Sequence, residues 1–325
     1  YIAAAVKAKT ALVEKHKMGG DCLNTGCVPS KALLASAKLA AQTRQAGKYG
    51  FNRVEADFQF SNIMDRVQSI VKTVEPHDSM ERYTRLGVDC YKAEAKILSP
   101  YEVRVGQKHL TTRNIIVATG AKPMVPDLPG LDRVDYLTSD TVWELRDLPE
   151  HMTILGAGPI GCELAQAFSR LGAKVVLVQR GPQILKKEDP DAAKIIRQAL
   201  ESEGVEVLTG HGAKAVSKEN GETSLVCDHE GRQVHIPFDR LLIALGRTPN
   251  VKGFGLEELG VDLRSGQSIE ANEFLETNFP NIFCSGDVHG RYQFTHTAAH
   301  ESWYASVNAL FGRFKKFRVD YSTIP

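Results

Sequence analysis

Two stretches of the chain share one order of hydrophobic and polar positions. Residues 6–16 read VKAKTALVEKH and residues 171–180 read LGAKVVLVQR, and each passes from the end of a predicted helix through a turn into a buried strand. Later in each half, NIIVATGAKP at 114–123 is echoed by LLIALGRTP at 241–249. The repeat predicts an α/β fold with two nucleotide-binding domains of common design in tandem.

The second half carries a complete nucleotide-binding pattern. An apolar strand at 152–156 leads into a predicted amphipathic helix at 160–171 and a second strand at 174–178. Three glycines in the spacing GxGxxG, namely Gly156, Gly158 and Gly161, run from the end of the first strand into the start of the helix. Such glycines permit a tight turn and a close approach of pyrophosphate to the helix N-terminus. A glycine-rich turn without a ligand is the alternative.

The first half lacks the equivalent glycine loop. Counting back from Glu14 by the spacing of the second half places that loop about 20 residues earlier, before Tyr1. Residues 1–8 are then expected to be the tail of a phosphate-binding helix. We therefore expect a fragment of a longer polypeptide, incomplete at both ends.

Three further segments have a predicted structure or role. Residues 58–86 show apolar positions at helical spacing, which predicts one long amphipathic helix. Residues 88–117 predict short strands broken at Pro100 and Gly106. The proline-rich stretch 124–149 is expected to be a crossing between the domains.

The segment GGDCLNTGCVPSK at 19–31 carries the candidate chemistry. Pro29 and the helix-forming residues after it place Cys27 at the start of a helix, where the N-terminus stabilises a thiolate. Lys31 lies one turn later and brings an ammonium to the same end. Glycines on both sides of Cys22 let the backbone bend so that Cys22 reaches Cys27. The arrangement favours an exchangeable disulfide.

Other readings of these residues stay open. An inert structural disulfide needs neither the proline nor the lysine, and a zinc site needs about four ligands, for which no second cysteine pair at zinc spacing exists. His296 and His300 have metal-ligand spacing in HTAAHE but lack a third ligand. We expect them on a helix surface or a cofactor wall, and we predict no metal site.

Composition narrows the functional classes. The 325 residues are 42% hydrophobic and 24% charged, and 40 basic against 39 acidic residues give a net charge of +1. That balance exerts no general attraction on nucleic acid or anionic membrane. No apolar run reaches membrane-spanning length, and no secretory signal opens the chain. Six cysteines are too few for a disulfide scaffold, so a cytoplasmic location is expected.

Five motifs together resemble the flavoprotein pyridine nucleotide-disulfide oxidoreductases, the group that contains dihydrolipoyl dehydrogenase, glutathione reductase and mercuric reductase. They are the cysteine segment, ATG at 118–120, GAGPIGCELAQAF at 156–168, ALGRTPN at 244–250 and CSGD at 284–287. The resemblance covers nearly the whole chain in the family's order. It implies two Rossmann-like domains of three-layer β-β-α character, with FAD in the first and a pyridine nucleotide in the second.

The resemblance also implies roles for single residues. Cys27 would interact with the flavin, Cys22 would exchange with the substrate, and a buried Lys31 would require the counter-charge of Glu163. Asp287 would accept hydrogen bonds from the ribityl chain, and the helix that begins near His296 would face the flavin's pyrimidine edge. The remaining cofactor-binding positions implied by the motifs are Glu14, Gly20, Thr25, Thr119, Gly120, Gly156, Gly158, Gly161 and Gly246.

The repeat indicates which nucleotide the second domain takes. Glu14 ends the first repeat and suits a ribose 2′-hydroxyl, whereas the second repeat has Gln179 there and Arg180 next to it. A missing carboxylate and an added guanidinium favour a 2′-phosphate. NADP is therefore expected, with NAD and a dual-specificity enzyme as the alternatives.

Domain limits and substrate follow from the same resemblance. The expected limits are 1–147 for the FAD domain, 148–265 for the NAD(P) domain and 266–325 for a return to the FAD domain. The family's catalytic His-Glu pair and homodimer interface would lie in a domain absent from this chain, and Pro159 replaces an aromatic that covers the nicotinamide in several members. A small-molecule disulfide or a metal ion is the expected substrate. The mercuric reductase type is favoured, dihydrolipoyl dehydrogenase is the alternative, and a nucleotide-binding module without turnover is a third reading.

Overall fold

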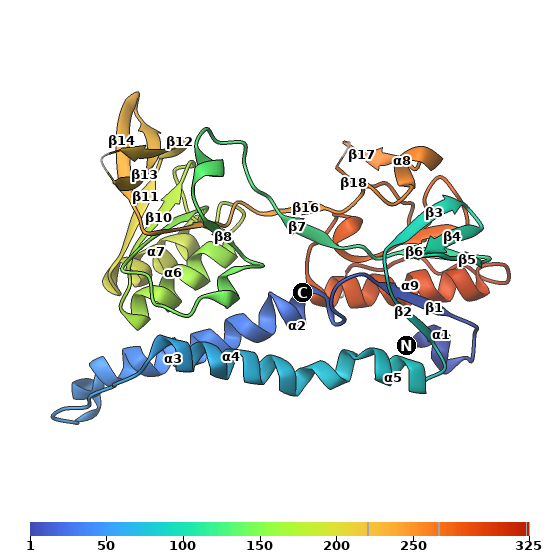
Figure 1. The fold of residues 1–325 in the computed structure, drawn as a ribbon, viewed down its shortest axis with the longest axis horizontal. Helices are drawn as coiled ribbons and strands as arrows, with labels where there is room; N and C mark the ends of the chain where they lie inside the picture. The colour runs from blue at the N-terminus through green and yellow to red at the C-terminus, as the bar shows by residue number, and fades with distance from the viewer. Residues whose placement is uncertain (220, 266, 323, 325) are drawn as a thin grey trace. The chain divides into compact units, whose positions relative to one another are not determined.

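The chain divides into two compact units, each assembled from segments far apart in the sequence. The computed structural model describes residues 1–219, 221–265, 267–322 and 324. Unit 1 comprises Tyr1–Gly20, Val74–Lys122 and Arg247–Pro325, and unit 2 comprises Asp21–Thr73 and Pro123–Gly246 (Figure 1). These limits differ from the expected ones at 147 and 265. The assignment of one nucleotide to each domain stays a prediction.

Unit 2 is built on a five-stranded parallel sheet. Its strands are hydrogen-bonded in the order β11-β10-β9-β15-β8. They are β8 (Tyr136–Thr138), β9 (His151–Leu155), β10 (Lys174–Gln179), β11 (Val205–Thr209) and β15 (Arg240–Ile243). β9 and β15 are nearly continuous apolar runs, because a parallel sheet covered on both faces buries successive side chains alike.

Helices cover one face of this sheet and a second sheet covers the other. Met152 and Ile154 point into a core shared with the helices, whereas Leu155 and Ile243 pack against the antiparallel sheet β12-β13-β14. The covering strands are β12 (Gly212–Glu219), β13 (Glu222–His229) and β14 (Arg232–Pro237). The helices of unit 2 are α2 (Gly20–Asn24), α3 (Cys27–Arg44), α4 (Phe60–Val74), α6 (Pro159–Leu171) and α7 (Pro190–Ser202), with 3-10 turns η1 (Ala46–Tyr49), η3 (Leu131–Arg133) and η4 (Val142–Glu144). The three-layer β-β-α arrangement is thus confirmed in this unit.

Unit 1 contains two short parallel strand pairs, β1-β2 and β19-β6. The antiparallel sheet β3-β4-β5 packs on β6 and β19 through Ile97, Ile115 and Ile282, and helix α9 contacts the same two strands. The strands of this unit are β1 (Ala11–Glu14), β2 (Asp89–Lys92), β3 (Ala95–Ser99), β4 (Glu102–Val105), β5 (Lys108–Thr111), β6 (Ile115–Val117), β7 (Ala121–Pro123), β16 (Arg247–Pro249), β17 (Leu263–Arg264), β18 (Ser268–Ile269) and β19 (Ile282–Cys284). Its helices are α1 (Ile2–Ala5), α5 (Met80–Arg85), α8 (Leu256–Leu259) and α9 (Thr295–Phe311), with η2 (Glu75–Asp78) and η5 (Gly286–Val288).

Two predictions about the connecting segments are wrong. The single helix expected at 58–86 is interrupted: α4 ends at Val74, and η2 separates it from α5. Pro76 lies in η2, and a proline cannot donate the hydrogen bond that would continue the helix. The stretch 124–149 is more than a crossing, because it supplies edge strand β8 and the buried residues Val142 and Trp143.

Candidate functional site

The cysteine segment folds as two helices joined by one sharp bend. Cys22 lies in the short helix α2, which the sequence did not predict, and Cys27 is the first residue of α3, as predicted. Between them, a Cβ on Gly26 would stand 2.9 Å from the Asp21 carbonyl oxygen and 3.3 Å from the Cys22 Cα. Only glycine permits this approach of the two helices. Cys22 is half-buried and Cys27 is exposed.

Trp143 anchors the loop between the two cysteines. Its indole Nε1 donates to the carbonyl oxygen of Thr25 at 3.0 Å and to that of Ser139 at 2.7 Å. The ring itself is buried in the main core of unit 2, so the contact ties the loop to that core. The Oγ1 of Thr25 is buried and has no hydrogen-bond partner within the described part of the chain.

Lys31 and Glu163 form the ion pair that the resemblance implies. The Lys31 Nζ donates to both carboxylate oxygens of Glu163, at 2.6 and 2.7 Å, and so links α3 to α6. The expectation of a buried ammonium is wrong in this structure, since 61% of the Lys31 side chain and 42% of the Glu163 side chain are exposed. Water screens an exposed pair, so it contributes at most about 1 kcal/mol to stability.

The glycine loop of unit 2 has the shape that a dinucleotide requires. Gly156 has a φ of +111°, and Cβ atoms on Gly156 and Gly161 would collide with the backbone oxygens of Ala244 and Gly156. Gly158 differs, since its Cβ would meet no described atom within 4 Å. Two glycines are thus needed for packing, and the third leaves the helix N-terminus open to a phosphate. These residues fit a pyridine nucleotide.

Gln179 and Arg180 lie at the carboxyl end of β10, beside this loop. The Gln179 Oε1 accepts from the Ala157 N–H at 3.4 Å, so the end of the strand contacts the glycine loop directly. Arg180 is exposed. Gly246 follows β15 with a φ of +118°, and its carbonyl accepts from the Met124 N–H at 2.9 Å.

In unit 1, the ATG motif at 118–120 is hydrogen-bonded to Asn250, the last residue of the ALGRTPN motif. The Thr119 Oγ1 donates to the Asn250 carbonyl at 2.7 Å, the Asn250 Nδ2 donates to the Thr119 carbonyl at 2.9 Å, and the Asn250 N–H donates to the Gly120 carbonyl at 2.9 Å. Gly120 has a φ of +66°, which favours glycine. Thr119 and Gly120 therefore form a fixed corner.

Asp287 lies in η5 above a buried polar network. Burial raises the pKa of its carboxyl; Arg247, 3.7 Å away, opposes this effect, and Glu301 adds to it. Glu301 is fully buried and accepts three hydrogen bonds: from the Gly286 N–H at 2.7 Å, from the His289 Nδ1 at 2.9 Å and from the Tyr321 hydroxyl at 2.7 Å. Burial raises the pKa of Tyr321, and its bond to Glu301 raises it further. Glu301 thus holds the turn that carries Asp287.

The remaining predicted residues of unit 1 lie on separate elements. Glu14 ends β1 and accepts from the His16 N–H at 2.7 Å, and Gly20 has a φ of +61°. His296 is exposed at the start of α9 and stacks on Phe294. His300 bonds to the Asp320 carbonyl at 2.7 Å. Within the described ranges no group of three metal-ligating side chains occurs, and no helix is long and apolar enough to cross a membrane.

The predicted site residues thus fall into two sets. Those of unit 2 are Cys22, Thr25, Cys27, Lys31, Gly156, Gly158, Gly161, Glu163, Gln179, Arg180 and Gly246, and those of unit 1 are Glu14, Gly20, Thr119, Gly120, Asp287 and His296. In unit 1 a second buried hydroxyl, the Thr297 Oγ1 in the first turn of α9, has no partner within the described residues. An orphaned buried polar atom such as Thr297 Oγ1 fits a polar ligand such as FAD.

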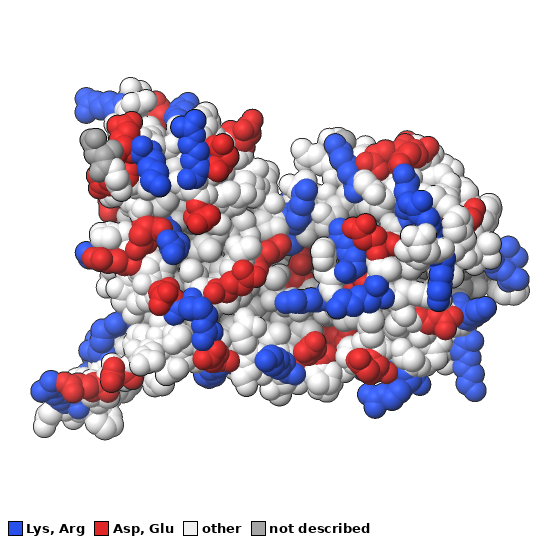
Figure 2. All heavy atoms as spheres, in the orientation of Figure 1, with Lys and Arg blue, Asp and Glu red and all other residues white. Residues whose placement is uncertain are grey.

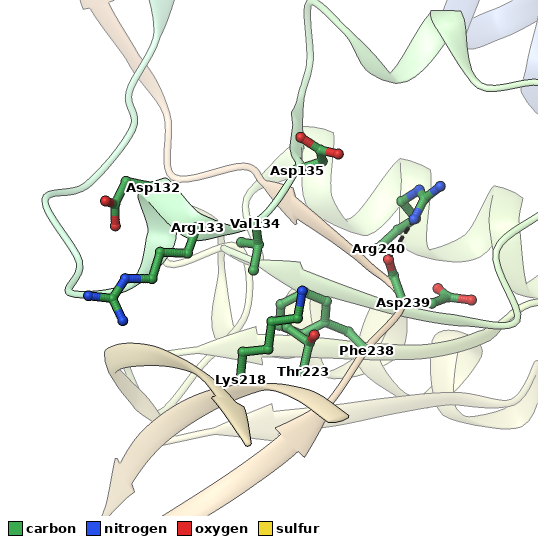
Figure 3. A pocket seen from close by; sticks show the side chains of 9 residues that line it. All are labelled: Asp132, Arg133, Val134, Asp135, Lys218, Thr223, Phe238, Asp239 and Arg240. Carbon is green, nitrogen blue, oxygen red and sulfur yellow. Dashed lines mark hydrogen bonds between the residues drawn. The ribbon is translucent and has the colours of Figure 1, made fainter. Parts of the chain in front are cut away.

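A cavity of about 360 Å³ in unit 2 is not part of this site. It is lined by side chains near the start of β15 and from β12, β13 and the turn at η3, and the Arg240 Nη1 donates to the Asp239 carbonyl at its edge (Figure 3). Ligands of open parallel sheets bind at the carboxyl ends of the strands, whereas this cavity lies at the amino end of β15. Acidic and basic side chains are interspersed over the face of the molecule that Figure 2 shows.

Sequence reasoning missed two of the residues that hold the site. Trp143 gives no local signal because its partner Thr25 is 118 positions away. Glu301 ends the HTAAHE segment, but the metal-ligand spacing in that segment concerns only His296 and His300. A glutamate among apolar residues on a core helix is the signal that points to a buried, hydrogen-bonded carboxylate.

Comparison with known proteins identifies relatives that match most of this chain. The family described as pyridine nucleotide-disulphide oxidoreductase matches residues 1–302. A mercuric reductase of Staphylococcus aureus is 31% identical over 327 residues, covering 99% of this chain and 59% of that protein. A dihydrolipoyl dehydrogenase of Acholeplasma laidlawii is 34% identical over 304 residues, covering 92% of this chain and 88% of that protein.

A solved structure supports the same relationship. The HOCl-induced flavoprotein disulfide reductase RclA from Escherichia coli has a TM-score of 0.84 and 26% identity, covering 98% of this chain and 69% of that one. The chain spans 50% to 69% of the length of four mercuric reductases that it matches.

Proposed function

The chain belongs to the pyridine nucleotide-disulphide oxidoreductase family, and from this premise we propose that Cys22 and Cys27 are a redox-active pair that carries electrons from a pyridine nucleotide to a small substrate. The placement of Cys27 at the first residue of α3, in close approach to the Cys22 helix, is the observation that carries this proposal. FAD, held by residues such as Asp287, would supply two-electron transfer between the nicotinamide and the disulfide.

The chain's own residues account for the thiol steps. Two electrons and two protons convert the Cys22–Cys27 disulfide into two thiols. The helix N-terminus stabilises negative charge on Cys27, so Cys27 is the thiol that faces the electron donor. Cys22 then attacks a substrate disulfide as a thiolate, and Cys27 resolves the mixed disulfide and releases the substrate as dithiol. With a metal ion as substrate, the two thiolates bind the ion before its reduction.

The substrate class rests on the relatives. Proteins named mercuric reductase and dihydrolipoyl dehydrogenase match with similar identity, 31% and 34%. We propose a metal ion of the mercuric type as substrate, on the likeness of the α6 sequence CELAQAF, and a dihydrolipoyl dithiol as the second candidate. For the nucleotide we propose NADPH, because β10 ends at Gln179, Arg180 follows it, and no carboxylate stands at either position.

Absorption spectra of two variants of the full chain in its flavin-loaded form test the roles of the thiols. Cys22→Ser keeps the thiolate of Cys27 and is expected to retain a long-wavelength charge-transfer band. Cys27→Ser is expected to abolish the band. The reverse result exchanges the two roles, and a band that is absent from both variants and from the reduced wild type contradicts the proposal. Nucleotide binding without any reduction of the disulfide would favour a binding module instead.

A further inference from the structure

Two histidines that the thiol chemistry does not use stack on each other in unit 2. The rings of His211 and His229 are parallel, with centroids 4.0 Å apart and an angle of 4° between their planes. His211 follows β11 and His229 ends β13, so a loop and a strand end bring them together. His211 is buried, and His229 is half-buried.

Backbone carbonyls fix the tautomer of both rings. The His211 Nδ1 bonds to the Thr209 carbonyl at 2.7 Å, and the His229 Nδ1 bonds to the Gly210 carbonyl at 3.2 Å. A carbonyl only accepts, so each Nδ1 carries the proton. Neither Nε2 makes a hydrogen bond to another described residue. Each Nε2 is therefore the position that gains a proton when the ring becomes charged.

The pair lies beside the residues proposed to choose the nucleotide. The His211 N–H donates to the Gln179 carbonyl at 3.0 Å, and the neighbouring Gly212 would place a Cβ 3.8 Å from the Arg180 Cγ. Both contacts are at the carboxyl ends of β10 and β11, the edge of the sheet where the adenosine half of a dinucleotide binds. Arg180 and the two imidazole rings thus lie together at this edge of the sheet.

Charged groups of both signs lie on the elements around this edge of the sheet. From α7, the Arg197 Nη1 donates to the Thr209 Oγ1 at 3.4 Å, while its Nε pairs with Glu201 at 2.8 Å. Other charged groups on the packed elements include Lys186, Lys187 and Glu188 after β10, Glu206 on β11, Lys214 on β12, Asp228 on β13, Glu230 in the turn after it and Arg232 on β14.

We propose that His211 and His229 form, with Arg180, the site for the 2′-phosphate of the nucleotide, and that their protonation makes the preference for NADPH increase as the pH falls. The inference deepens the nucleotide preference in the proposed function and rests on it. Protonation turns a lone pair of Nε2 into a charged donor, and charge-assisted hydrogen bonds to phosphate are the strong ones. A ribose 2′-hydroxyl gains far less from the same change.

Calorimetric binding of two ligands to the full chain tests this. Adenosine 2′,5′-bisphosphate carries the 2′-phosphate, and adenosine 5′-monophosphate lacks it. Between about pH 8 and about pH 6, the ratio of their dissociation constants is expected to change by roughly tenfold in favour of the bisphosphate. Near neutral pH, binding of the bisphosphate should take up protons, which titrations in buffers of different ionisation enthalpy measure.

Variants test whether the histidines cause the proton uptake and the pH dependence. In the double variant His211→Gln and His229→Gln, the proton uptake and the pH dependence should fall to what the ligand's own phosphate ionisation gives, which all variants share. His235→Gln on β14, where the ring bonds to Ser224, is the matched control and should behave as wild type. Arg180→Ala should lower the ratio at both pH values and keep its slope.

Two results would overturn the inference. If the wild type and the double variant show the same slope and the same proton uptake, the histidines do not bind the phosphate, although the NADPH preference and the thiol proposal stand. Equal affinity for both ligands at both pH values rejects the inference and the nucleotide preference together, and it leaves the roles of Cys22 and Cys27 untouched.

Discussion

The Lys31 ammonium holds both carboxylate oxygens of Glu163, at 2.6 and 2.7 Å. One partner lies one turn after Cys27 on α3, and the other lies in the second turn of α6, directly after the glycine loop. The pair therefore connects the helix of the proposed redox thiol to the helix of the proposed nucleotide site, both within unit 2.

Glu163→Gln is expected to slow reduction of the disulfide by NADPH while changing stability little. Because both side chains are largely exposed, the free energy of unfolding in urea should change by less than about 1 kcal/mol. Stopped-flow spectra of the flavin-loaded full chain give the rate. Lys96→Met, which breaks the similarly exposed Lys96–Glu258 pair in unit 1, is the matched control and should leave the rate unchanged.

The six cysteines should differ sharply in reactivity. Burial raises the pKa of Cys162 and of Cys227 to about 11, and it raises the pKa of Cys284 further. A raised pKa keeps these thiols protonated and unreactive near neutral pH, whereas Cys27 is exposed at a helix start. Mass spectrometry after brief iodoacetamide treatment of the reduced protein should find Cys27 labelled before these three. Early labelling of Cys227 would contradict this order.

Trp143→Phe should destabilise unit 2 and loosen the cysteine loop. The phenyl ring keeps most of the buried area but cannot donate to the carbonyls of Thr25 and Ser139. Leaving these acceptors without the indole costs about 1–3 kcal/mol in the free energy of unfolding. Hydrogen exchange of the loop amides should speed up as well. Trp303→Phe is the control, since Trp303 is 42% exposed and should tolerate the change.

The ends of the two repeats predict the nucleotide preference. We expect NADPH to exceed NADH in kcat/KM by at least about tenfold, the scale of one charge-assisted contact. Arg180→Ala should remove most of that ratio, and Gln179→Glu should shift it toward NADH because a carboxylate repels the 2′-phosphate. Steady-state kinetics of the full-length enzyme measure the ratio of kcat/KM for NADPH to kcat/KM for NADH. An unchanged ratio in Arg180→Ala would falsify the assignment.

Asp287 should make unit 1 less stable as the pH rises. Burial raises its pKa, so the folded chain binds this proton more tightly than the unfolded chain does. Its contribution favours folding at pH values below the ordinary aspartate range and is lost as the pH rises through the raised pKa. Asp287→Asn should therefore raise the melting temperature of the ligand-free chain near neutral pH and not at about pH 3. Equal increases in melting temperature at both pH values would argue against the raised pKa of Asp287 as the cause.

Local and repeated features could be predicted from the sequence. The strand, glycine loop and helix around Gly156 are determined by neighbours in the chain, and Pro29 marks the start of α3 within two residues. The break at Pro76 was also readable from the sequence, because proline ends a helix, but the apolar spacing on both sides of it concealed the break. The helix-breaking effect of one proline was outweighed there by the helical spacing of the apolar residues around it.

Features that depend on contacts between residues far apart in the chain could not be predicted from the sequence. Strand β8 forms because β15, more than a hundred positions later, offers a parallel edge, so residues 124–149 resemble a linker when considered alone. The exposure of Lys31 and the burial of Glu301 likewise depend on which elements pack around them. The motif resemblance named Lys31 and Glu163 as a pair, but it did not indicate how much water reaches them.

The discontinuous make-up of unit 2 has a consequence for how the protein is synthesised. Lys31 and Glu163 are 132 positions apart, so the ribosome releases the cysteine helices long before α6 exists. Contacts of such long separation form late and slow the folding of a domain. Until β9, α6 and β10 have emerged, the nascent chain carries its two proposed redox thiols without the structure that holds them in place. Synthesis under oxidising conditions is therefore the moment at which these cysteines are most exposed to damage.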